Sequence, residues 1–386
     1  MVVVSNLEYG GAQRQIVELV NNMDPDRYRV RIVSLSDYLP LQKQLRPGID
    51  VDVVYKKSRF DFTVAFKLAR LIRQFNIDVI HSYLFDAEIA ARLAGLLSFR
   101  RPVVIGSERN TDYALKRVQL VAYKLTKKLV DAVIANSRAG ASFNAETLGQ
   151  PESLYRVIHN GVDTNKFKPQ DRAMARQPLG LTEDDVAIGV FASFKAQKNH
   201  PFLFEAILPI LDRYPRLRLV LVGDMLFQGM HGSDDYHAGV MKMIETTRLA
   251  GHCVLLGNRD DIQDVYPACD FTVLPSLFEG TPNVLLESMA CGVPVVATNV
   301  SDNAIIVEHD RTGLLVDSGD VAGLRSALTL MLDNEEKRIV LGKNARERMV
   351  SAFSSAKLAE KTMAVYDEFV DRRPALAGRQ PDGYNG

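Results

Sequence analysis

Short apolar runs alternate with stretches of helical periodicity along the first half of the chain. The runs expected to be strands are VVVS, YRVRIVSL, VDVVY, DVIHSY, PVVIGS, AVIANS and RVIHNG. The periodicity between them predicts helices from about Ala12 and over Thr63–Phe75, Ala87–Leu97 and Tyr113–Leu129. Apolar strands separated by helices form parallel sheets that are covered on both faces. The first half therefore predicts a doubly wound α/β domain.

A polar stretch, Asp163–Asp185, interrupts this alternation and is expected to be a linker because it holds Pro169, Pro178 and Gly180. The alternation then resumes. Strands are expected at VAIGVFASF, LRLVLVG, CVLLG, DFTVLPS and PVVAT, and helices over Pro201–Tyr214, Val240–Leu249 and Asp261–Tyr266. Three helical segments follow the run GLLV, the last of them over Ser354–Val370. The second half predicts another doubly wound domain.

The expected architecture is thus α/β, with two Rossmann-like domains facing across a cleft. The first domain is expected over 1–168 and the second over 169–353, with the helix at about 354–370 packing back on the first domain. Residues 371–386 are expected to be a disordered tail. Ligands of doubly wound sheets bind beyond the carboxyl ends of the strands, which places the expected ligand in the cleft.

Charge is distributed unevenly along the chain. The 386 residues are 47% hydrophobic, which suffices for two cores, and carry no net charge. Residues 1–170, however, hold 25 basic and 17 acidic side chains, whereas residues 171–386 hold 22 and 30. A basic first half favours an anionic partner, such as a phospholipid surface or a phosphorylated acceptor. No nucleic-acid partner is expected.

The three cysteines, Cys253, Cys269 and Cys291, lack the paired spacings of zinc sites and disulfide frameworks. No apolar run is long enough for a membrane span, and the amino end lacks the charged-then-apolar order of a signal peptide. These features predict buried free thiols in a cytoplasmic protein. The inner face of the cell membrane is the alternative location.

The stretch LFEGTPNVLLESMACGVPVV, Leu277–Val296, carries the most chemistry. Thr281 is expected as an N-cap and Pro282 as the first residue of a helix that ends near Cys291. Backbone amides at a helix start bind anions, and the carboxylates of Glu279 and Glu287 suit sugar hydroxyls. The stretch therefore outlines a sugar-nucleotide site. A capped, mostly buried helix with two glutamates on its wet side would give the same pattern.

Several motifs in order resemble one family. GGAQRQIVEL follows the first strand, and VIHNGVD, QKNH, LVLVGD, EGTPNVLLESMACGVPVV and TGLLV come after it. Over about residues 1–370 the chain resembles the retaining GT-B glycosyltransferases of family 4 (group 1). The signature of that family is a glutamate, seven residues and a second glutamate.

The resemblance implies a role for each matching residue. Glu279 resembles the glutamate that binds the donor sugar, Glu287 the one that binds the ribose, and Lys198 the lysine that neutralises the pyrophosphate. Glu279 and Lys198 are the implied catalytic residues. Gly11 would allow close backbone approach, although Gly10-Gly11 also fits a plain tight turn. The implied donor-binding set is Gly11, Ser193, Lys195, Lys198, Arg259, Glu279, Gly280, Thr281, Pro282, Asn283, Val284 and Glu287.

Two departures from the family pattern stand out. Where the family usually has Gly-Arg-Leu, this chain has Ala192-Ser193-Phe194-Lys195, so Lys195 is expected to replace the arginine's charge. Where the family often has a histidine after the fifth strand, Glu108 and Arg109 follow instead. These two residues and His81 form the expected acceptor side. A histidine at a strand end is also common as a structural residue.

No metal and no cofactor are expected, because a helix start and lysines can accept a nucleoside diphosphate leaving group. His231, Asp234, Asp235 and His237 in GMHGSDDYH superficially resemble a metal cluster. Their spacing fits neither a helix face nor a known ligand pattern, so the stretch is interpreted as a mobile loop beside the cleft.

The basic segment YALKRVQLVAYKLTKKLV is compatible with two environments. Its apolar positions, Leu115, Val118, Val121, Ala122, Leu125 and Leu129, repeat with helical spacing among lysines and arginines. Such a helix can lie on anionic lipid. The alternative is an ordinary domain helix that packs its apolar stripe on the sheet.

The resemblance implies a cytoplasmic enzyme that moves a hexose from a UDP- or GDP-sugar to a hydroxyl of a glycan or lipid-linked acceptor, with retention of configuration. One alternative is a nucleotide-sugar epimerase or hydrolase on the same fold, without a glycan acceptor. The other is a non-catalytic nucleotide-sugar-binding protein, which would be expected to lack Glu279 or Lys198, and both are present.

Overall fold

The chain folds into two compact α/β units. The computed structural model describes residues 1–58, 61–109, 115–223 and 233–373, the side chains of residues 233 and 234 excepted. Unit 1 consists of residues 1–161 and the segment from Ser355 onward, and unit 2 of Val162–Ser354. The change of unit falls at Gly161, seven residues before the expected boundary at 168. Most of the expected tail, 374–386, lies outside the described residues.

Unit 1 contains a seven-stranded sheet with the order β3-β2-β1-β4-β5-β6-β7. All of its strand pairs are parallel. The strands are β1 (Val2–Val4), β2 (Arg31–Ser34), β3 (Asp50–Val53), β4 (Val79–Tyr83), β5 (Val103–Glu108), β6 (Ala132–Ala135) and β7 (Tyr155–Val157). The helices are α1 (Gly11–Asn22), α2 (Thr63–Gln74), α3 (Phe85–Leu97), α4 (Arg117–Thr126), α5 (Arg138–Leu148) and α14 (Ser355–Asp371).

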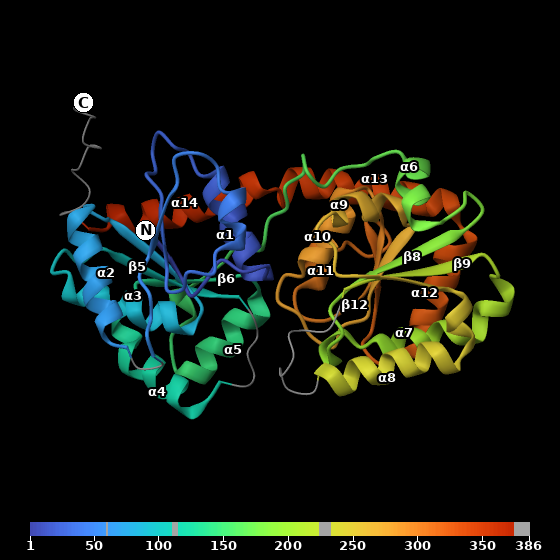
Figure 1. The fold of residues 1–386 in the computed structure, drawn as a ribbon, viewed down its shortest axis with the longest axis horizontal. Helices are drawn as coiled ribbons and strands as arrows, with labels where there is room; N and C mark the ends of the chain where they lie inside the picture. Colours follow the sequence, from blue (N-terminus) through green and yellow to red (C-terminus); the bar gives the residue numbers. More distant parts are fainter. Residues whose placement is uncertain (59–60, 110–114, 224–232, 374–386) are drawn as a thin grey trace. The chain divides into compact units, whose positions relative to one another are not determined.

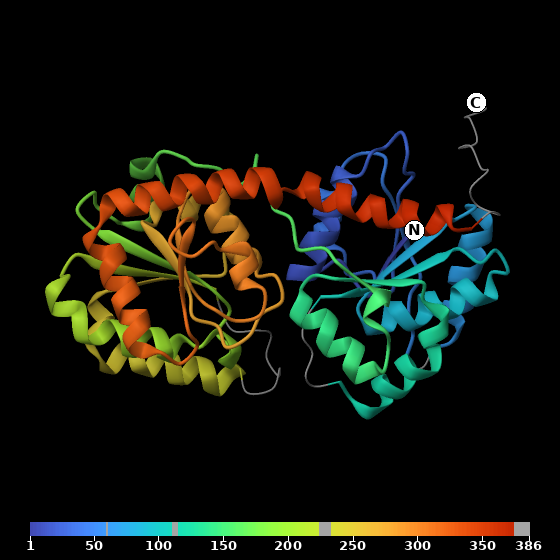
Figure 2. The same cartoon turned by 180° about the vertical axis from the view of Figure 1, so that it is seen from behind.

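Alternate residues of the unit 1 strands enter different cores. Val2 and Val4 pack with α1 and α14, whereas Val3 packs with α2 and α3 on the other face. Figures 1 and 2 show α14, in red, running beside α1, in blue, and the two helices are in contact. The last described helix of the chain therefore completes the core of the first unit.

Unit 2 contains a six-stranded sheet with the order β10-β9-β8-β11-β12-β13, again with parallel pairs throughout. Its strands are β8 (Val186–Phe191), β9 (Leu217–Val222), β10 (Cys253–Gly257), β11 (Phe271–Leu274), β12 (Val295–Thr298) and β13 (Gly313–Val316). Its helices are α6 (Arg172–Arg176), α7 (His200–Ile207), α8 (Ser233–Thr246), α9 (Ile262–Val265), α10 (Asn283–Ala290), α11 (Asn303–Ile306), α12 (Val321–Asp333) and α13 (Glu335–Ala352).

The helices of unit 2 lie on two faces of its sheet. Helices α7, α8 and α12 form one core with the sheet, and α9, α10 and α13 form the other, as Figure 1 shows. The sheets are thus covered on both faces, as the mostly apolar strands predict. None of the helices in the described ranges is long and apolar enough to cross a membrane.

Helix α5 was not predicted from the sequence. Its ends carry recognisable signals: the Ser137 side chain accepts a hydrogen bond from the Gly140 amide, and Gly149 ends the helix in the left-handed conformation. Apart from Leu148, its buried face consists of small and polar residues such as Ala141 and Asn144, so the apolar periodicity is weak. The short helix α11 was missed as well. The predicted helix over Tyr113–Leu129 is shorter, since α4 begins at Arg117.

The prediction that Asp163–Asp185 forms a linker is wrong, because this segment is packed into unit 2. The Arg176 side chain is 2% exposed and donates hydrogen bonds to Asp270 and to the carbonyl oxygens of Ala268, Thr182 and Asp185. The Arg176–Asp270 distance is 2.7 Å. A buried guanidinium with this many acceptors fixes the segment to the sheet.

We predict that Arg176→Ala lowers the free energy of unfolding by about 3 kcal/mol or more, since it leaves buried acceptors and a carboxylate without this partner. Urea denaturation monitored by circular dichroism measures the change. Arg172→Ala is the matched control: it also pairs with Asp270, but its side chain is 42% exposed, so its expected cost is below about 1 kcal/mol. Equal losses in the two variants would contradict the prediction.

Candidate active site

In unit 2, two neighbouring strands end in close contact. The Ala192 amide after β8 donates to the Val222 carbonyl oxygen at the end of β9, at 2.9 Å. Gly223 has φ +141°, and a Cβ atom there would lie 2.1 Å from the Ala192 carbonyl oxygen. Only glycine fits this position without moving the backbone. The loop that carries Ser193 and Lys195 therefore starts from a fixed point.

The central contact of the site joins Lys198 to Glu279. Lys198 ends a short 3-10 turn, η5 (Ala196–Lys198), and its Nζ lies 2.5 Å from Glu279 Oε1. The two side chains are only 13% and 8% exposed. The Gln197 side chain donates to the Phe278 carbonyl oxygen at 2.7 Å, and the Leu277 amide donates to the Gln197 carbonyl oxygen at 2.9 Å. The loops after β8 and β11 are thus held together beside the expected sugar site.

The loop that carries Glu279 is also anchored to the next strand. The Glu279 amide donates to Ser301 Oγ at 3.1 Å, and the Thr298 hydroxyl at the end of β12 donates to the Ser276 carbonyl oxygen at 2.6 Å. Ser301 has φ +50°. Neither Ser301 nor Gln197 was proposed as a site residue, because their role depends on contacts between loops that are far apart in sequence.

Helix α10 begins one residue later than expected. Pro282 occupies the N-cap position, no side chain caps the helix, and Asn283 is its first residue. The prediction of Thr281 as the N-cap is therefore wrong. Gly280, Thr281 and Pro282 are buried in the turn before the helix, whereas Asn283 and Val284 are partly exposed in its first turn. The backbone amides of this turn remain suited to an anion because of the helix dipole.

Glu287 lies one turn inside α10 and is held by a tyrosine. The Tyr266 hydroxyl donates to Glu287 Oε2 at 2.8 Å, and the Tyr266 ring stacks on Phe191 at a centroid distance of 3.8 Å. Burial, followed by the charge of Glu287, raises the pKa of Tyr266 well above its usual value, so the hydroxyl keeps its proton. Tyr266 thus orients the carboxylate expected to bind the ribose. Sequence reasoning missed it, since the contact spans 21 positions.

The other predicted donor residues of unit 2 lie in the loops after β8 and β10. Burial, and then the charge of Lys198, lowers the pKa of Lys195. An anion bound beside both lysines would relieve this repulsion. Arg259 forms a two-point ion pair with Asp261, with its Nε 2.7 Å from Oδ1, so it has a partner in its own loop.

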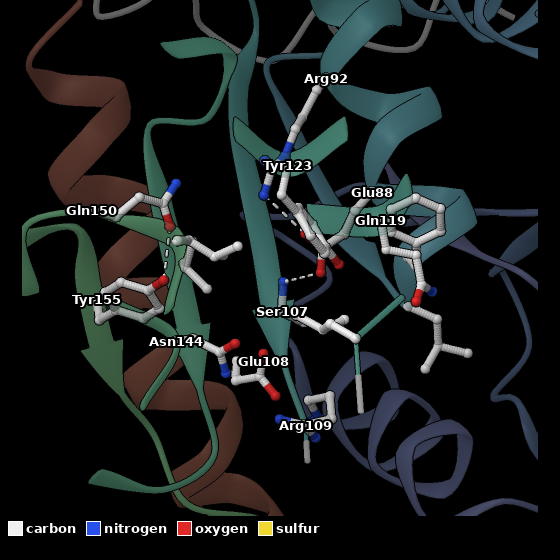
Figure 3. A pocket seen from close by; sticks show the side chains of 15 residues that line it. Glu88, Arg92, Ser107, Glu108, Arg109, Gln119, Tyr123, Asn144, Gln150 and Tyr155 are labelled. Carbon is white, nitrogen blue, oxygen red and sulfur yellow. Dashed lines mark hydrogen bonds and ion pairs between the residues drawn. The ribbon is translucent and has the colours of Figure 1, made fainter. Parts of the chain in front are cut away.

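In unit 1, a cavity of about 130 Å³ lies beside the carboxyl end of β5. Figure 3 shows Glu88 and Arg92 from α3, Gln119 and Tyr123 from α4, and Asn144 from α5 around Ser107 and Glu108. The full lining is Leu84, Phe85, Glu88, Arg92, Ser107, Glu108, Arg109, Leu115, Gln119, Tyr123, Val133, Asn144, Leu148, Gln150 and Tyr155. Two of the three expected acceptor-side residues, Glu108 and Arg109, thus line one cavity.

A buried ion pair forms one wall of this cavity. Glu88 and Arg92 are 3.0 Å apart, and their side chains are 5% and 2% exposed. Glu88 also accepts a hydrogen bond from the Ser107 amide at 3.3 Å, and Arg92 donates to Thr126. Burial raises the pKa of Glu88 to about 7 despite the opposing charge of Arg92. Neither Glu88 nor Arg92 was predicted as a site residue.

His81 lies inside β4 rather than beyond its end, and it is 2% exposed. Its ring nitrogens contact the Tyr366 hydroxyl at 2.6 Å and the Ser107 hydroxyl at 2.7 Å. Burial, and then the charge of Arg109, lowers the pKa of His81 well below its usual value, so the ring is neutral. These contacts favour the structural alternative for His81.

Gly11, the one donor residue predicted in unit 1, is the first residue of α1, directly after the N-cap Gly10. A Cβ atom on Gly10 would lie 2.2 Å from the Gln13 side chain. The Gln13 amide in turn donates to Asn6 at 2.9 Å. The glycine pair therefore makes a compact turn at the carboxyl end of β1, which fits both the tight-turn interpretation and a close backbone approach.

The stretch GMHGSDDYH is not entirely a loop. Asp235 and His237 belong to helix α8, and the His237 ring packs edge-on against Phe194 with centroids 5.0 Å apart. His231 and the Asp234 side chain lie outside the described residues. Among the side chains that the structure describes, no group of three or more His, Cys, Asp or Glu residues could hold a metal ion.

Two all-parallel Rossmann-like units, one of which presents a glutamate, seven residues and a second glutamate around a helix start, define a glycosyltransferase with the GT-B fold. Family models agree, one on each unit. The model described as "Glycosyl transferases group 1" matches residues 171–348, and "Glycosyltransferase Family 4" matches residues 9–166. The chain belongs to this family, group 1 or family 4 of the glycosyltransferases.

Characterised relatives span most of the chain. An Escherichia coli UDP-Gal:alpha-D-GlcNAc-diphosphoundecaprenol alpha-1,3-galactosyltransferase is 28% identical over 80% of both chains. A Bacillus anthracis N-acetyl-alpha-D-glucosaminyl L-malate synthase is 23% identical over 81% of this chain and 80% of its own. A D-inositol 3-phosphate glycosyltransferase of Kribbella flavida is 27% identical over 92% and 90%.

Solved structures share the fold. Anabaena Alr3699/HepE in complex with UDP superposes with a TM-score of 0.82 at 23% identity, over 95% of this chain and 99% of that one. Sucrose-phosphate synthase from Thermosynechococcus elongatus gives a TM-score of 0.77 at 20% identity, over 96% and 99%. At these identities the likeness establishes the fold alone.

We predict that Lys198→Ala weakens the binding of a nucleoside diphosphate, UDP or GDP, about 10- to 100-fold, the value of one charge-assisted hydrogen bond. Lys195→Ala should weaken nucleoside diphosphate binding in the same direction if Lys195 supplies the charge of the missing arginine. Isothermal titration calorimetry measures both effects. Lys337→Ala is the control, because Lys337 is also ion-paired, with Asp310, but belongs to α13. Unchanged affinity in Lys195→Ala would refute the replacement.

Proposed function

We propose that this glycosyltransferase moves a hexose from a UDP- or GDP-sugar to a hydroxyl of a glycan or lipid-linked acceptor, with retention of configuration and without a metal. The observation that carries the proposal is the Lys198–Glu279 contact of 2.5 Å beside the start of α10. It brings together a cation for a diphosphate, a carboxylate for sugar hydroxyls and the amides of a helix start.

In the proposed reaction, the bond between the sugar's anomeric carbon and the diphosphate oxygen breaks first. The departing diphosphate takes the bonding electrons, and its negative charge is stabilised by Lys198, by Lys195 and by the amides at the start of α10. The acceptor hydroxyl attacks from the same face of the oxocarbenium-like sugar and gives its proton to the departing phosphate oxygen. Glu279 holds the sugar hydroxyls and does not attack, while Glu287, oriented by Tyr266, holds the ribose.

The donor and acceptor classes are supported by the relatives and by the unit 1 cavity. UDP and UDP-glucose occupy the HepE structures, and the E. coli relative uses a lipid diphosphate-linked sugar as acceptor. In the cavity, Arg92 Nε, Arg109 Nε and Gln150 Nε2 are buried without a hydrogen-bond partner in the described part of the chain. Buried donors of this kind suit the hydroxyl groups of a glycan.

We predict that Glu279→Gln lowers the transfer rate about a hundredfold, equivalent to about 2.7 kcal/mol of transition-state stabilisation, because the amide loses the charge that holds Lys198 and the sugar. Turnover of a panel of UDP- and GDP-sugars is measured at saturating donor, and nuclear magnetic resonance reads the product's anomeric configuration, which we expect to be retained.

Glu308→Gln serves as the control for this change, since Glu308 is another ion-paired carboxylate of unit 2 but contacts Arg348 and Arg311. Circular dichroism should show that both variants remain folded, so that a loss of turnover in Glu279→Gln alone reports on the site. An inverted product, or near-wild-type turnover in Glu279→Gln, would refute the assigned role. Donor cleavage that no glycan accelerates would favour the hydrolase or epimerase alternative, and UDP-sugar binding without turnover would favour the binding protein.

The proposal also predicts full activity after exhaustive chelation, because the lysines and the helix start supply the positive charge that a metal would otherwise bring between the phosphates. Turnover is compared before chelation, after it, and after Mn²⁺ is restored. Activity that disappears with the chelator and returns with Mn²⁺ would refute metal independence and direct attention to the stretch that contains Asp235 and His237.

A further inference from the structure

Helix α4 presents apolar side chains to solvent instead of packing them on the sheet. Val118, Val121 and Leu125 are 52%, 56% and 80% exposed. They recur at intervals of three and four residues, so they lie along one face of the helix. The alternative in which the whole apolar stripe packs on the sheet is therefore wrong for these three residues. Leu96 and Phe99, at the end of the neighbouring helix α3, are 57% and 87% exposed as well.

The other exposed side chains of this segment are all basic. They are Lys116, Arg117, Lys124, Lys127 and Lys128, and the sequence from residue 116 to residue 128 contains no acidic residue. Asp131, the next carboxylate along the chain, is paired with Arg373. An apolar row flanked by cations without compensating carboxylates is complementary to an anionic lipid surface, where apolar groups enter the interface and cations contact the head groups.

The opposite face of α4 lines the unit 1 cavity. Gln119 and Tyr123 take part in the lining, together with Leu115 just before the helix. The Tyr123 ring packs edge-on against Phe85 and lies 5.0 Å from the Arg92 guanidinium. One helix therefore separates the exposed row from the cavity that contains Glu108 and Arg109, as the position of Gln119 and Tyr123 in Figure 3 illustrates.

We infer that the exposed face of α4 docks on an anionic membrane, so that an acceptor anchored in the bilayer presents its head group beside the unit 1 cavity. This inference rests on the proposed function, which it deepens by naming the surface that meets a lipid-linked acceptor. An eight-residue set, Lys116, Arg117, Val118, Val121, Lys124, Leu125, Lys127 and Lys128, forms the docking face.

Sedimentation of the full chain with vesicles tests the docking face. We expect binding to phosphatidylcholine vesicles that contain phosphatidylglycerol, little binding to phosphatidylcholine alone, and weaker binding at high salt. Val121→Ser/Leu125→Ser should reduce the partition coefficient about tenfold, and Lys124→Glu/Lys128→Glu at least as much. A wild-type chain that stays in the supernatant of the anionic vesicles overturns the inference.

Ile339→Ser/Val340→Ser is the matched control, because these α13 residues are 65% and 52% exposed but stand among side chains of both charges. An equal loss of vesicle binding in this control would overturn the inference. Light scattering measures the oligomeric state and so tests whether a second copy of the chain, rather than a membrane, covers the docking face. A wild-type dimer that becomes a monomer in Val121→Ser/Leu125→Ser would assign the face to self-association and also overturn it.

Two further readouts separate this inference from the proposed function. Calorimetry with UDP, without vesicles, should give the same affinity for Val121→Ser/Leu125→Ser as for the wild type, since neither residue lies in the donor loops. Turnover of UDP- and GDP-sugars then reports on the proposed reaction independently. Vesicle binding without any sugar transfer would support the docking face and refute the proposed reaction. Sugar transfer without vesicle binding would support the proposed reaction and refute the docking face.

Discussion

Parallel pairing of every strand in both sheets is the constraint on which the rest of the structure depends. Because the carboxyl ends of parallel strands all lie at the same edge of their sheet, the loops that follow the strands lie close together at that edge. In unit 2 this edge collects Lys198, Glu279 and Ser301 from the loops after three different strands. The same constraint places the Gly10-Gly11 turn and Glu108 at the carboxyl ends of two strands of unit 1.

The buried ion pairs Arg176–Asp270 and Lys198–Glu279 differ in their surroundings and in their roles. The pair Arg176–Asp270 is surrounded by carbonyl acceptors and fixes a polar segment to a sheet, so its cost of burial is offset within the protein. The pair Lys198–Glu279 is slightly more exposed and lies beside a helix start and a second lysine. In the proposed function, its two charges exchange partners with a diphosphate and with sugar hydroxyls, which would let the site bind and release a charged donor.

Local patterns in the sequence predicted the strands, most helices and the loop with Glu279, because apolar period, proline and glycine act over a few residues. The errors arose where the deciding partner is distant. Segment 163–185 has the composition of a linker, and only the hydrogen bond between Arg176 and Asp270 shows that it packs on the sheet. Likewise, the residue that orients Glu287 is Tyr266, which lies 21 positions away in the sequence. Nor could periodicity tell which side of α4 faces the sheet, since Val118 and Ala122 belong to the same apolar stripe but only Val118 is exposed.

The return of α14 to unit 1 has a consequence for the order in which the protein matures on the ribosome. Leu358, Ala359 and Tyr366 belong to the same core as Val2 and Ile16, and Tyr366 also binds His81. Unit 2 is one continuous segment, so it can finish folding while α14 is still being translated, but unit 1 cannot close its core until α14 has emerged. Unit 1 is therefore begun before unit 2 but completed after it, and a chain truncated before residue 355 would leave an apolar groove where α14 belongs.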